Sequence, residues 1–393
     1  MSIKLPKRPK ILLTGGRAPV TLELARIFHR GGYQVYVAES FSNHLCRFSN
    51  KVNRSFTVPK PNQDPEAYRD ALIKIMNSEE IDWLIPTCEE IFQLARWKPE
   101  IETRSYGKIF CTDFATLIHL HNKYTFIQLA MDHGFNVPKT FLVSSMEELF
   151  RYQRELKMPL VIKPVFSRFG TKVKYLPVNI EQIPKIEISP EQQWVLQQQV
   201  FGVQYCTYSI IHQGRLTAHT TYRMGFNLHG GASISFEAVD HPAIVDFICR
   251  FSIAAQFTGQ IAFDIIEDSY GDLYPIECNP RTTSGVHLLA RDPAFIKAFF
   301  GSLPTPIFPN PCTKAMLILP MLYTGITSLS NSNTLKRWWH TFSSSRDVIW
   351  DCGDPIPFMQ QLTIPLSLWW IGRRNKLSMT EASTLDIEWN GES

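Results

Sequence analysis

Three oxygen-bearing side chains in the second half of the sequence have the spacing of a cation site. Glu277 and Asn279 are two residues apart at the end of a predicted strand, so both side chains point to one face of a sheet. Asp264 lies in the preceding predicted strand, 260–266, and a turn at 268–272 joins the two. Antiparallel pairing would bring Asp264 opposite the other two. Carboxylate and amide oxygens suit Mg²⁺, a hard cation that prefers them together with phosphate oxygens.

Basic side chains in the same part of the sequence favour an anionic ligand. Arg281 follows the strand of Glu277, where its guanidinium can hold an anionic oxygen in a fork. Lys163 closes the apolar predicted strand 159–164, and the loop 166–171 after it offers hydroxyl and backbone N–H groups that can cover phosphates. The alternative is that these side chains are merely solvated at strand ends. Glu277 argues against it, because its segment reads as half-buried, where an unpaired carboxylate is costly.

The elements that must position these residues change in type along the chain. Strands predicted at 10–14, 33–38, 82–86 and 108–111 alternate with helices such as 21–30, which indicates a parallel sheet with right-handed crossovers. The loops 15–19 and 87–90 would lie at carboxyl ends of strands, where such sheets bind ligands. An α+β pattern follows: a helix is predicted at 123–133, and strands at 159–164, 194–200, 205–211, 216–222, 260–266 and 273–278. We expect 194–200 and 205–211 to pair around Gly202.

The order of these motifs resembles the ATP-grasp superfamily of carboxylate ligases, in the branch of carbamoyl-phosphate synthase large-chain and D-alanine–D-alanine ligase-like domains. The resemblance spans about residues 8–290 and rests on Val161-Ile-Lys-Pro164, the hinge strand 196–202, and Ile276-Glu-Cys-Asn-Pro-Arg281 preceded by Asp264. It implies an α/β and α+β protein. A Rossmann-like pre-ATP-grasp sheet in 1–117 would precede an ATP-grasp fold of two α+β subdomains, a small nucleotide lobe (118–200) and a metal-binding lobe (201–300). Residues 301–393 would complete the fold or the substrate pocket.

The resemblance also implies roles for matching residues. Lys163 would hold the α- and β-phosphates, Arg281 would steady an acyl phosphate, and Asp264, Glu277 and Asn279 would bind Mg²⁺, with Mn²⁺ as an alternative. The residues implied to contact ATP are Lys123, Lys163, Ser167, Arg168, Gly170, Thr171, Gln198, Gln199, Val200 and Gln204. Candidate substrate contacts are Arg17, Glu89, Glu90, Arg223 and His229. The loop 166–171 is poorer in glycine than in the family, and 383–389 matches none of its well-known members.

The implied reaction joins a carboxylate and an amine through an acyl phosphate, giving an amide-type bond, ADP and phosphate. Two alternatives stay open. One is an enzyme that stops at an acyl or carboxy phosphate, as in carbamoyl-phosphate synthase. The other is an ATP-binding sensor without turnover, which the joint presence of the metal ligands and Arg281 disfavours. The turn 14–18 lacks the GxGxxG pattern, so NAD binding is disfavoured.

Composition excludes several other classes. The 393 residues carry 40 Lys and Arg against 36 Asp and Glu, a net charge of +4, too small to indicate a nucleic-acid partner. The eight cysteines are isolated, without CxxC spacing, and the start has no signal-peptide pattern, so we expect reduced thiols and a cytoplasmic protein. We interpret 362–371, followed by Arg373 and Arg374, as a buried element; an interfacial membrane segment is the alternative. A homodimer is the commonest state for such an enzyme.

Overall fold

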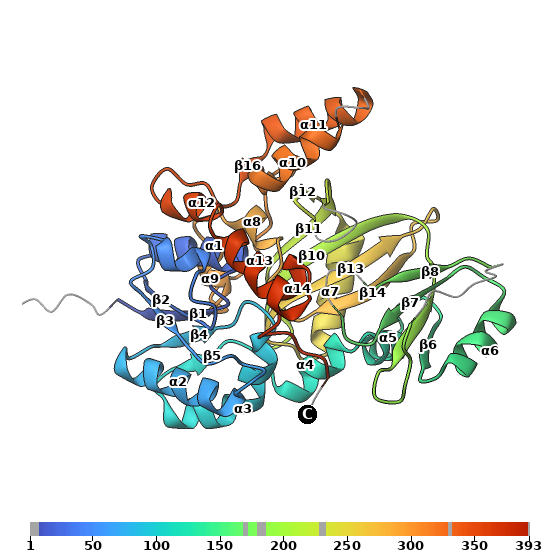
Figure 1. Cartoon of the computed structure of the whole chain (residues 1–393), viewed down its shortest axis with the longest axis horizontal. Helices are drawn as coiled ribbons and strands as arrows, with labels where there is room; N and C mark the ends of the chain where they lie inside the picture. Colours follow the sequence, from blue (N-terminus) through green and yellow to red (C-terminus); the bar gives the residue numbers. More distant parts are fainter. Residues whose placement is uncertain (1–7, 168–171, 179–185, 228–232, 329–331, 392–393) are drawn as a thin grey trace, which may run out of the picture.

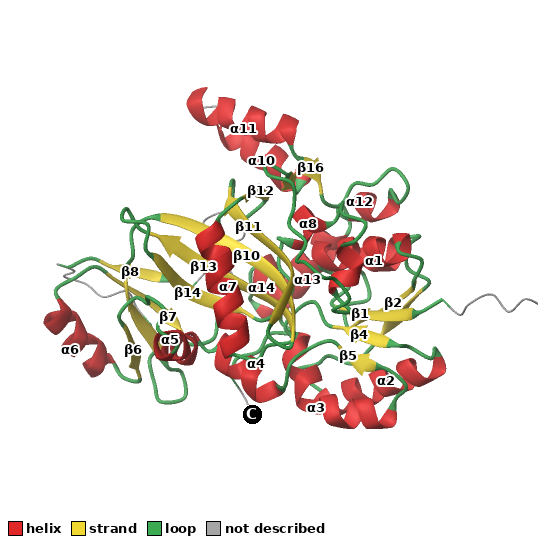
Figure 2. Ribbon diagram, turned by 180° about the vertical axis from the view of Figure 1, so that it is seen from behind, coloured by secondary structure: helices red, strands yellow, loops and turns green. Residues whose placement is uncertain are grey.

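Three β-sheets with covering helices make up the chain (Figure 1, Figure 2). This computed structural model describes residues 8–167, 172–178, 186–227, 233–328 and 332–391. The predicted fold class, a parallel α/β sheet followed by α+β sheets, is confirmed. The predicted domain boundaries at 117, 200 and 300 stay predictions.

The first sheet is parallel. Its strands, in the order β3-β2-β1-β4-β5, are β1 (Lys10–Thr14), β2 (Gln34–Glu39), β3 (Arg54–Thr57), β4 (Trp83–Ile85) and β5 (Lys108–Ile109). Helix α1 (Pro19–Arg30) and the short η1 (Leu45–Phe48) follow β1 and β2, while α2 (Pro65–Ser78) and α3 (Glu90–Arg104) lie on the opposite face (Figure 1). Strand alternation explains this: Leu12 packs with α2 and α3, and its neighbours Ile11 and Leu13 pack with α1. The strand order reverses between β1 and β4, where open α/β sheets bind ligands.

A four-stranded antiparallel sheet forms a small lobe. Its order is β6-β9-β7-β8, from β6 (Thr140–Val143), β7 (Leu160–Pro164), β8 (Lys174–Leu176) and β9 (Trp194–Gln198). Helices α4 (Phe114–His121) and α5 (Lys123–Asp132) precede the sheet, and α6 (Met146–Leu156) packs on it. The lobe has its own small core, in which Leu149 of α6 meets Ile162 and Leu196. This cluster is separate from the two larger clusters that join the other sheets.

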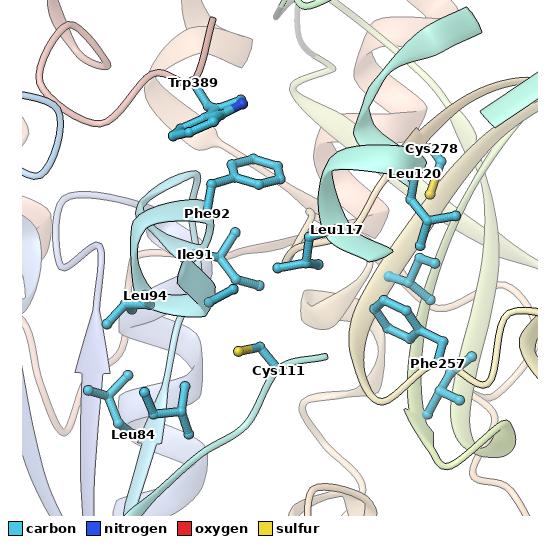
Figure 3. Close-up of a cluster of buried hydrophobic side chains, with 14 of the residues drawn as sticks. Leu84, Ile91, Phe92, Leu94, Cys111, Leu117, Leu120, Phe257, Cys278 and Trp389 are labelled. Carbon is cyan, nitrogen blue, oxygen red and sulfur yellow. The ribbon is translucent and has the colours of Figure 1, made fainter. Parts of the chain in front are cut away.

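The largest sheet carries the predicted cation ligands. Its order is β14-β13-β10-β11-β12-β15-β16, from β10 (Val203–His212), β11 (Arg215–Met224), β12 (Ser235–Val239), β13 (Gly259–Glu267), β14 (Leu273–Asn279), β15 (Lys314–Met316) and β16 (Arg346–Asp347). Helix α7 (Pro242–Ala254) packs on one face through Phe247 and Phe251, which contact Phe263. The short helices α8 (Val286–Leu289) and α9 (Phe295–Ala298) pack between the other face and α1. Figure 3 shows one apolar cluster that joins the first sheet, at Leu84, to this sheet, at Cys278.

One predicted strand pairing is wrong. Strands β9 and β10 do not pair around Gly202, because β9 belongs to the small lobe and β10 to the large sheet. Gly202 instead lies in the crossing between the two sheets, against the backbone of Glu267. A Cβ added there would lie 2.0 Å from the Glu267 carbonyl oxygen, so only glycine fits this crossing.

The last part of the chain adds helices and then returns to the first sheet. The helices are α10 (Ile318–Ser328), α11 (Ser332–Ser344), α12 (Ile356–Gln360), α13 (Ile364–Asn375) and α14 (Met379–Ala382). Helices α10 and α11 extend away from the sheets in both views (Figure 1, Figure 2). Our interpretation of 362–371 as a buried element is wrong, since Leu366 and Trp370 on α13 are 62% and 67% exposed. No helix within the described ranges is long and apolar enough to cross a membrane.

Candidate active site

The predicted cation ligands face one another on β13 and β14. Asp264 is directly opposite Glu277, and Asn279 is opposite Ala262, on the same face of the ladder. The Cys206 thiol on β10 donates a hydrogen bond of 2.9 Å to Asp264 Oδ1. Burial and the neighbouring charge of Glu277 raise the pKa of Asp264 to about 6. Two neighbouring ionised carboxylates repel each other, which lowers the stability of the fold. A cation bound between them would remove that repulsion.

The chemistry of this donor set fits magnesium. Across the described ranges, no group of three His, Cys, Asp or Glu side chains has a metal-binding arrangement, so the candidate set is two carboxylates and one amide. That is an all-oxygen set with few protein ligands, which suits Mg²⁺ because this ion is usually held by one or two carboxylates plus phosphate oxygens. Cys278, between two of the candidates, is buried in the apolar cluster on the opposite face, as strand alternation predicts.

Lys163 links the small lobe to the metal-binding strands. Its side chain is buried, and Nζ donates a 2.9 Å hydrogen bond to the carbonyl oxygen of Ile276 on β14. Burial lowers the pKa of Lys163 to about 8, against the opposing effect of Glu277. The alternative of a solvated strand-end lysine is therefore wrong. A buried ammonium beside Glu277 is placed to meet a phosphate as a point charge.

Lys123 holds the start of the phosphate loop next to Glu277. The side chain of Asn122 caps helix α5 by accepting from Tyr124 N and Thr125 N, which fixes the position of Lys123. Lys123 Nζ lies 3.1 Å from the Ser167 carbonyl oxygen and 3.7 Å from Glu277 Oε1. Ser167 therefore contributes a backbone oxygen here. The other predicted loop residues, Arg168, Gly170 and Thr171, lie outside the described residues.

Arg281 is held by a buried glutamate from the first sheet. Arg281 Nη2 donates to Asn279 Oδ1 over 3.1 Å, and Nε lies 3.6 Å from Glu89 Oε1. The Glu89 side chain has no exposed surface, and its Oε2 accepts the backbone N–H of Trp389 over 3.1 Å. The Trp389 ring packs on Phe92 of α3 (Figure 3). Of the predicted substrate contacts that the structure describes, Glu89 is the one joined to the cation face.

Arg17 lies in a closed ion-pair cluster rather than in an open pocket. Its guanidinium donates to both carboxylate oxygens of Glu39, and to Asp386 over 2.6 and 2.9 Å. Ser40 also donates to Asp386. Burial opposes the charge of Arg17, but the two carboxylates outweigh it and raise its pKa. A substrate carboxylate would have to displace Asp386, so the prediction that Arg17 binds substrate is not supported by this arrangement.

Glu90 has a structural position. Its Oε1 accepts from Thr14 Oγ1 over 2.6 Å and from the backbone N–H groups of Thr87 and Cys88. Burial raises the pKa of Glu90, although these hydrogen bonds oppose the rise. One carboxylate oxygen thus ties the ends of β1 and β4 together, which is the structural alternative to substrate contact at Glu90.

Arg223 is turned away from the cation ligands. It is opposite Tyr205 on β10, while the next pair along, Cys206 and Tyr222, is on the face of Asp264. Its guanidinium donates to the Tyr205 hydroxyl over 3.0 Å. Alternation along β11 thus places Arg223 on the face opposite to Asp264, and its contact with substrate stays a prediction. His229 lies outside the described residues.

The hinge between the lobes has part of its backbone already paired. The N–H of Gln198 bonds to the Lys139 carbonyl and that of Gln199 to the Pro159 carbonyl, over 2.8 and 3.0 Å. The hinge N–H offered to an adenine edge would then come from Val200. Gln204 is exposed near the start of β10, opposite Ile266. These four residues stay predicted ATP contacts.

One residue of this region was missed by the sequence reasoning. His121, the last residue of α4, is buried between the rings of Phe92 and Phe166, with centroids 4.7 and 5.6 Å away. Neither ring nitrogen has a hydrogen-bond partner in the described structure. Burial lowers its pKa to about 4, against the effect of Glu89. The apolar sequence around His121 does not itself indicate that this side chain lies near the candidate site. The available clue was that His121 comes two residues before Lys123.

Comparison with solved structures places this arrangement in a known fold, although no protein-family model matches the sequence. The N5-carboxyaminoimidazole synthetase of Staphylococcus aureus has a TM-score of 0.62 and 16% identity, over 83% of this chain and 88% of its own. The L-amino acid ligase of Bacillus licheniformis has a TM-score of 0.55 and 16% identity, over 73% and 71%. The chain has the ATP-grasp fold.

A further ATP-grasp structure was solved with nucleotide bound. The biotin carboxylase domain dimer of the Hydrogenobacter thermophilus 2-oxoglutarate carboxylase, in complex with MgADP, ADP and bicarbonate, has a TM-score of 0.59 and 11% identity. The similarity covers 76% of this chain and 72% of that one. At such identities the likeness establishes the ATP-grasp arrangement of strands. The roles of single residues have to be argued from their own geometry in this chain.

Proposed function

We propose that this protein is an ATP-dependent ligase that joins a carboxylate to an amine through an acyl phosphate. The observation that carries the proposal is the half-buried pair Asp264 and Glu277, flanked by the ammonium groups of the buried Lys123 and Lys163. Carboxylates that hold a divalent cation, next to lysines that hold phosphates, form the machinery of a γ-phosphoryl transfer. A protein that only senses a nucleotide has no need of all these groups.

Each residue at the site would have a separate task. Asp264, Glu277 and Asn279 would hold Mg²⁺, which supplies charge neutralisation on the phosphates. Lys163 would contact the α- and β-phosphates, and Lys123 would fix the start of the phosphate loop through Ser167. Because Lys123 and Lys163 are buried, their charges act in a medium of low dielectric constant, where each contributes more than it would in water. The hinge around Gln198–Val200, with Gln204, would hold the adenosine.

Arg281 would act on the acceptor side. Its guanidinium lies beside Asn279 and is held by Glu89, so it can steady the charge of a substrate carboxylate and then of its acyl phosphate. The attacking amine has to be neutral. His121, whose lowered pKa keeps it unprotonated near neutral pH, would be a compatible neighbour for that amine. Its packing against Phe166 would connect it to the phosphate loop that excludes water.

Similar proteins support this class of reaction and leave the substrates open. The names of the similar proteins include an L-amino acid ligase and an N5-carboxyaminoimidazole synthetase. We therefore favour carbon–nitrogen bond formation over a sensor. The alternative of an enzyme that stops at an acyl or carboxy phosphate has one observation in its favour: the acceptor candidate Arg17 is already paired with Asp386.

The test is ADP release from Mg²⁺-ATP by the full chain, measured with a panel of carboxylic acids, each with and without mixed amino acids. A ligase releases ADP only when one acid and one amine are both present, and the amide product appears by mass spectrometry. Release with an acid alone would favour the acyl-phosphate enzyme. If ATP raises the melting temperature but the acid and amine panel changes neither ADP release nor that temperature, the ligase proposal fails in favour of a sensor.

A further inference from the structure

Helices α12 and α13 present an apolar surface that the rest of the described chain does not cover. Six large side chains on these helices and the turn between them are 43–67% exposed: Ile356, Met359, Leu362, Leu366, Trp369 and Trp370. On α13, Leu366, Trp369, Trp370 and Arg373 follow the spacing of one helical face. We name this surface, 356–376, the α12–α13 face. Contiguous exposed apolar side chains of this size usually mark an interaction site.

The face belongs to a well-anchored part of the structure. Phe358 and Ile364 point inward and pack against the buried cluster around α1. On the inner side of α13, Ser367 Oγ accepts a 3.0 Å hydrogen bond from Asn43 Nδ2. The helix is therefore fixed to the body along one side and bare along the other, which is the geometry of a docking surface rather than of a frayed end.

The charge of the face has one sign. Residues 356–376 contain Arg373, Arg374 and Lys376 and no acidic residue. Over 312–380 there are seven basic and three acidic residues, so the excess positive charge of this region equals the +4 of the whole chain. Arg373 lies over the ring of Trp369, 5.3 Å from its centroid, so apolar and cationic groups share one edge.

We propose that the α12–α13 face binds the surface of an anionic lipid bilayer. A helix with Leu and Trp on one side and basic residues beside them lies in the plane of the membrane interface, with its apolar side chains among the acyl chains. Trp is favoured at this depth, and long Arg and Lys side chains reach the headgroups from it. The interaction needs no membrane-spanning segment.

A second copy of the chain is a poorer occupant for the same face. In a two-fold dimer the same patch of each copy meets, so Arg373, Arg374 and Lys376 would face a surface that carries the same basic residues and no acidic one. Like charges brought together repel, and the face offers no carboxylate to pair with them. An anionic lipid surface removes that repulsion and accepts the apolar side chains as well.

Sedimentation of the full chain with vesicles tests the proposal. The vesicles contain phosphatidylcholine alone, or phosphatidylcholine with about a third phosphatidylserine. The wild type should sediment with the anionic vesicles and stay in solution with the neutral ones. Leu366→Ser/Trp370→Ser and Arg373→Ser/Arg374→Ser should each reduce the bound fraction about tenfold or more, because each removes one of the two contributions to binding.

A matched control distinguishes binding through the α12–α13 face from nonspecific adsorption of exposed aromatic side chains to vesicles. Tyr106→Ser/Tyr270→Ser removes two side chains that are 76% and 90% exposed on other elements, and it should bind as the wild type does. The substituted positions are exposed, so unchanged melting temperatures should accompany every variant. If the wild type ignores anionic vesicles, or if Leu366→Ser/Trp370→Ser binds them as well as the wild type, the proposal is overturned. A wild-type dimer that this variant converts to monomer would instead assign the face to self-association.

Discussion

The buried Glu89 and the half-buried Arg281 form an ion pair between the two largest sheets of the molecule, with Arg281 Nε 3.6 Å from Glu89 Oε1. Glu89 stands at the start of α3, after β4, and Arg281 follows β14. The two residues belong to different sheets, so neither sheet alone accounts for the contact between them. The pair makes the orientation of the proposed acyl-phosphate arginine depend on a residue of the first sheet, and through Trp389 on the end of the chain.

Replacing Glu89 should therefore impair turnover without affecting ATP binding. Glu89→Gln keeps an oxygen for the Trp389 N–H but removes the charge that holds Arg281. We expect kcat to fall about 10- to 100-fold, with little change in the KM for ATP, because only the orientation of the arginine is lost. Steady-state kinetics would measure this, with Glu147→Gln on the exposed start of α6 as a control. A variant with wild-type kcat would contradict a positioning role for Glu89.

The cation face gives a second prediction. Glu277→Gln keeps the shape of the side chain but removes one of the two carboxylates, so turnover should fall at least about 1,000-fold. It should also lower the pKa of Asp264, because the neighbouring negative charge that raises it is gone. Titration of the Mg²⁺ requirement, together with ADP release, would measure the effect. Asp272→Asn, in the exposed turn between β13 and β14, is the control; equal loss in both variants would indicate a folding defect.

The pair formed by Arg17 and Asp386 leads to a prediction about stability. Asp386→Asn removes one of the two carboxylates of a guanidinium whose side chain is only 10% exposed. The free energy of unfolding should fall by about 1–3 kcal/mol, because hydrogen bonds to a charged group are lost while Glu39 still balances the charge. Urea denaturation would measure it. Glu191→Gln, an exposed residue bonded to Ser189, should change nothing. If Asp386→Asn is as stable as the wild type, the C-terminal segment is not fixed by this ion pair.

Glu23 makes stability depend on pH in the acid range. Burial raises its pKa, but Arg346 and His287 outweigh burial and lower it from 4.5 to about 2. Burial lowers the pKa of His287, so its imidazole is uncharged at neutral pH. The positive charge beside Glu23 then comes from Arg346, whose Nη2 lies 2.7 Å from Glu23 Oε2. A lowered carboxyl pKa stabilises the fold above the unfolded-state value, and this contribution is lost as the pH falls from about 5 towards 2.

Glu23→Gln should remove that dependence. The wild type should lose about 3 kcal/mol of stability from this group over the acid range. The variant should be less stable near pH 7, and its stability should fall less steeply below pH 5. Urea denaturation at a series of pH values would show the two curves converge as the pH falls. Parallel curves would mean that Glu23 is not the group responsible.

The sequence predicted the elements whose signals are local. Alternation placed Glu277 and Asn279 on one face with Asp264 opposite, and the strand predicted at 159–164 is present as Leu160–Pro164, because both patterns depend on neighbouring residues. The face on which Arg223 lies could not be predicted in this way. The register between β10 and β11 places it opposite Tyr205, which the hairpin turn at Gly214 determines only once the pairing is known.

Contacts between distant segments could not be predicted in this way. Nothing near Trp389 indicates that its N–H meets Glu89, and nothing near Asp386 indicates Arg17, since each pair is separated by most of the chain. His121 was missed for the same reason: its burial depends on Phe92 and Phe166, which come from other elements. The prediction that 362–371 is buried failed for a different reason. An apolar composition was taken as evidence of coverage, and the structure leaves those side chains bare.

Because the C-terminal segment returns to the first sheet, that sheet cannot complete its contacts until late in translation. Domains generally fold from the N-terminal end while the ribosome is still adding residues. Here Arg17 and Glu39 would already be buried together while their third partner, Asp386, has yet to be translated. Glu89 likewise accepts the backbone N–H of Trp389 only after Trp389 has been translated. The first sheet can thus complete these contacts only after residues 386–389 have been translated, so a chain cut before Asp386 would leave Arg17 and Glu89 without these two partners.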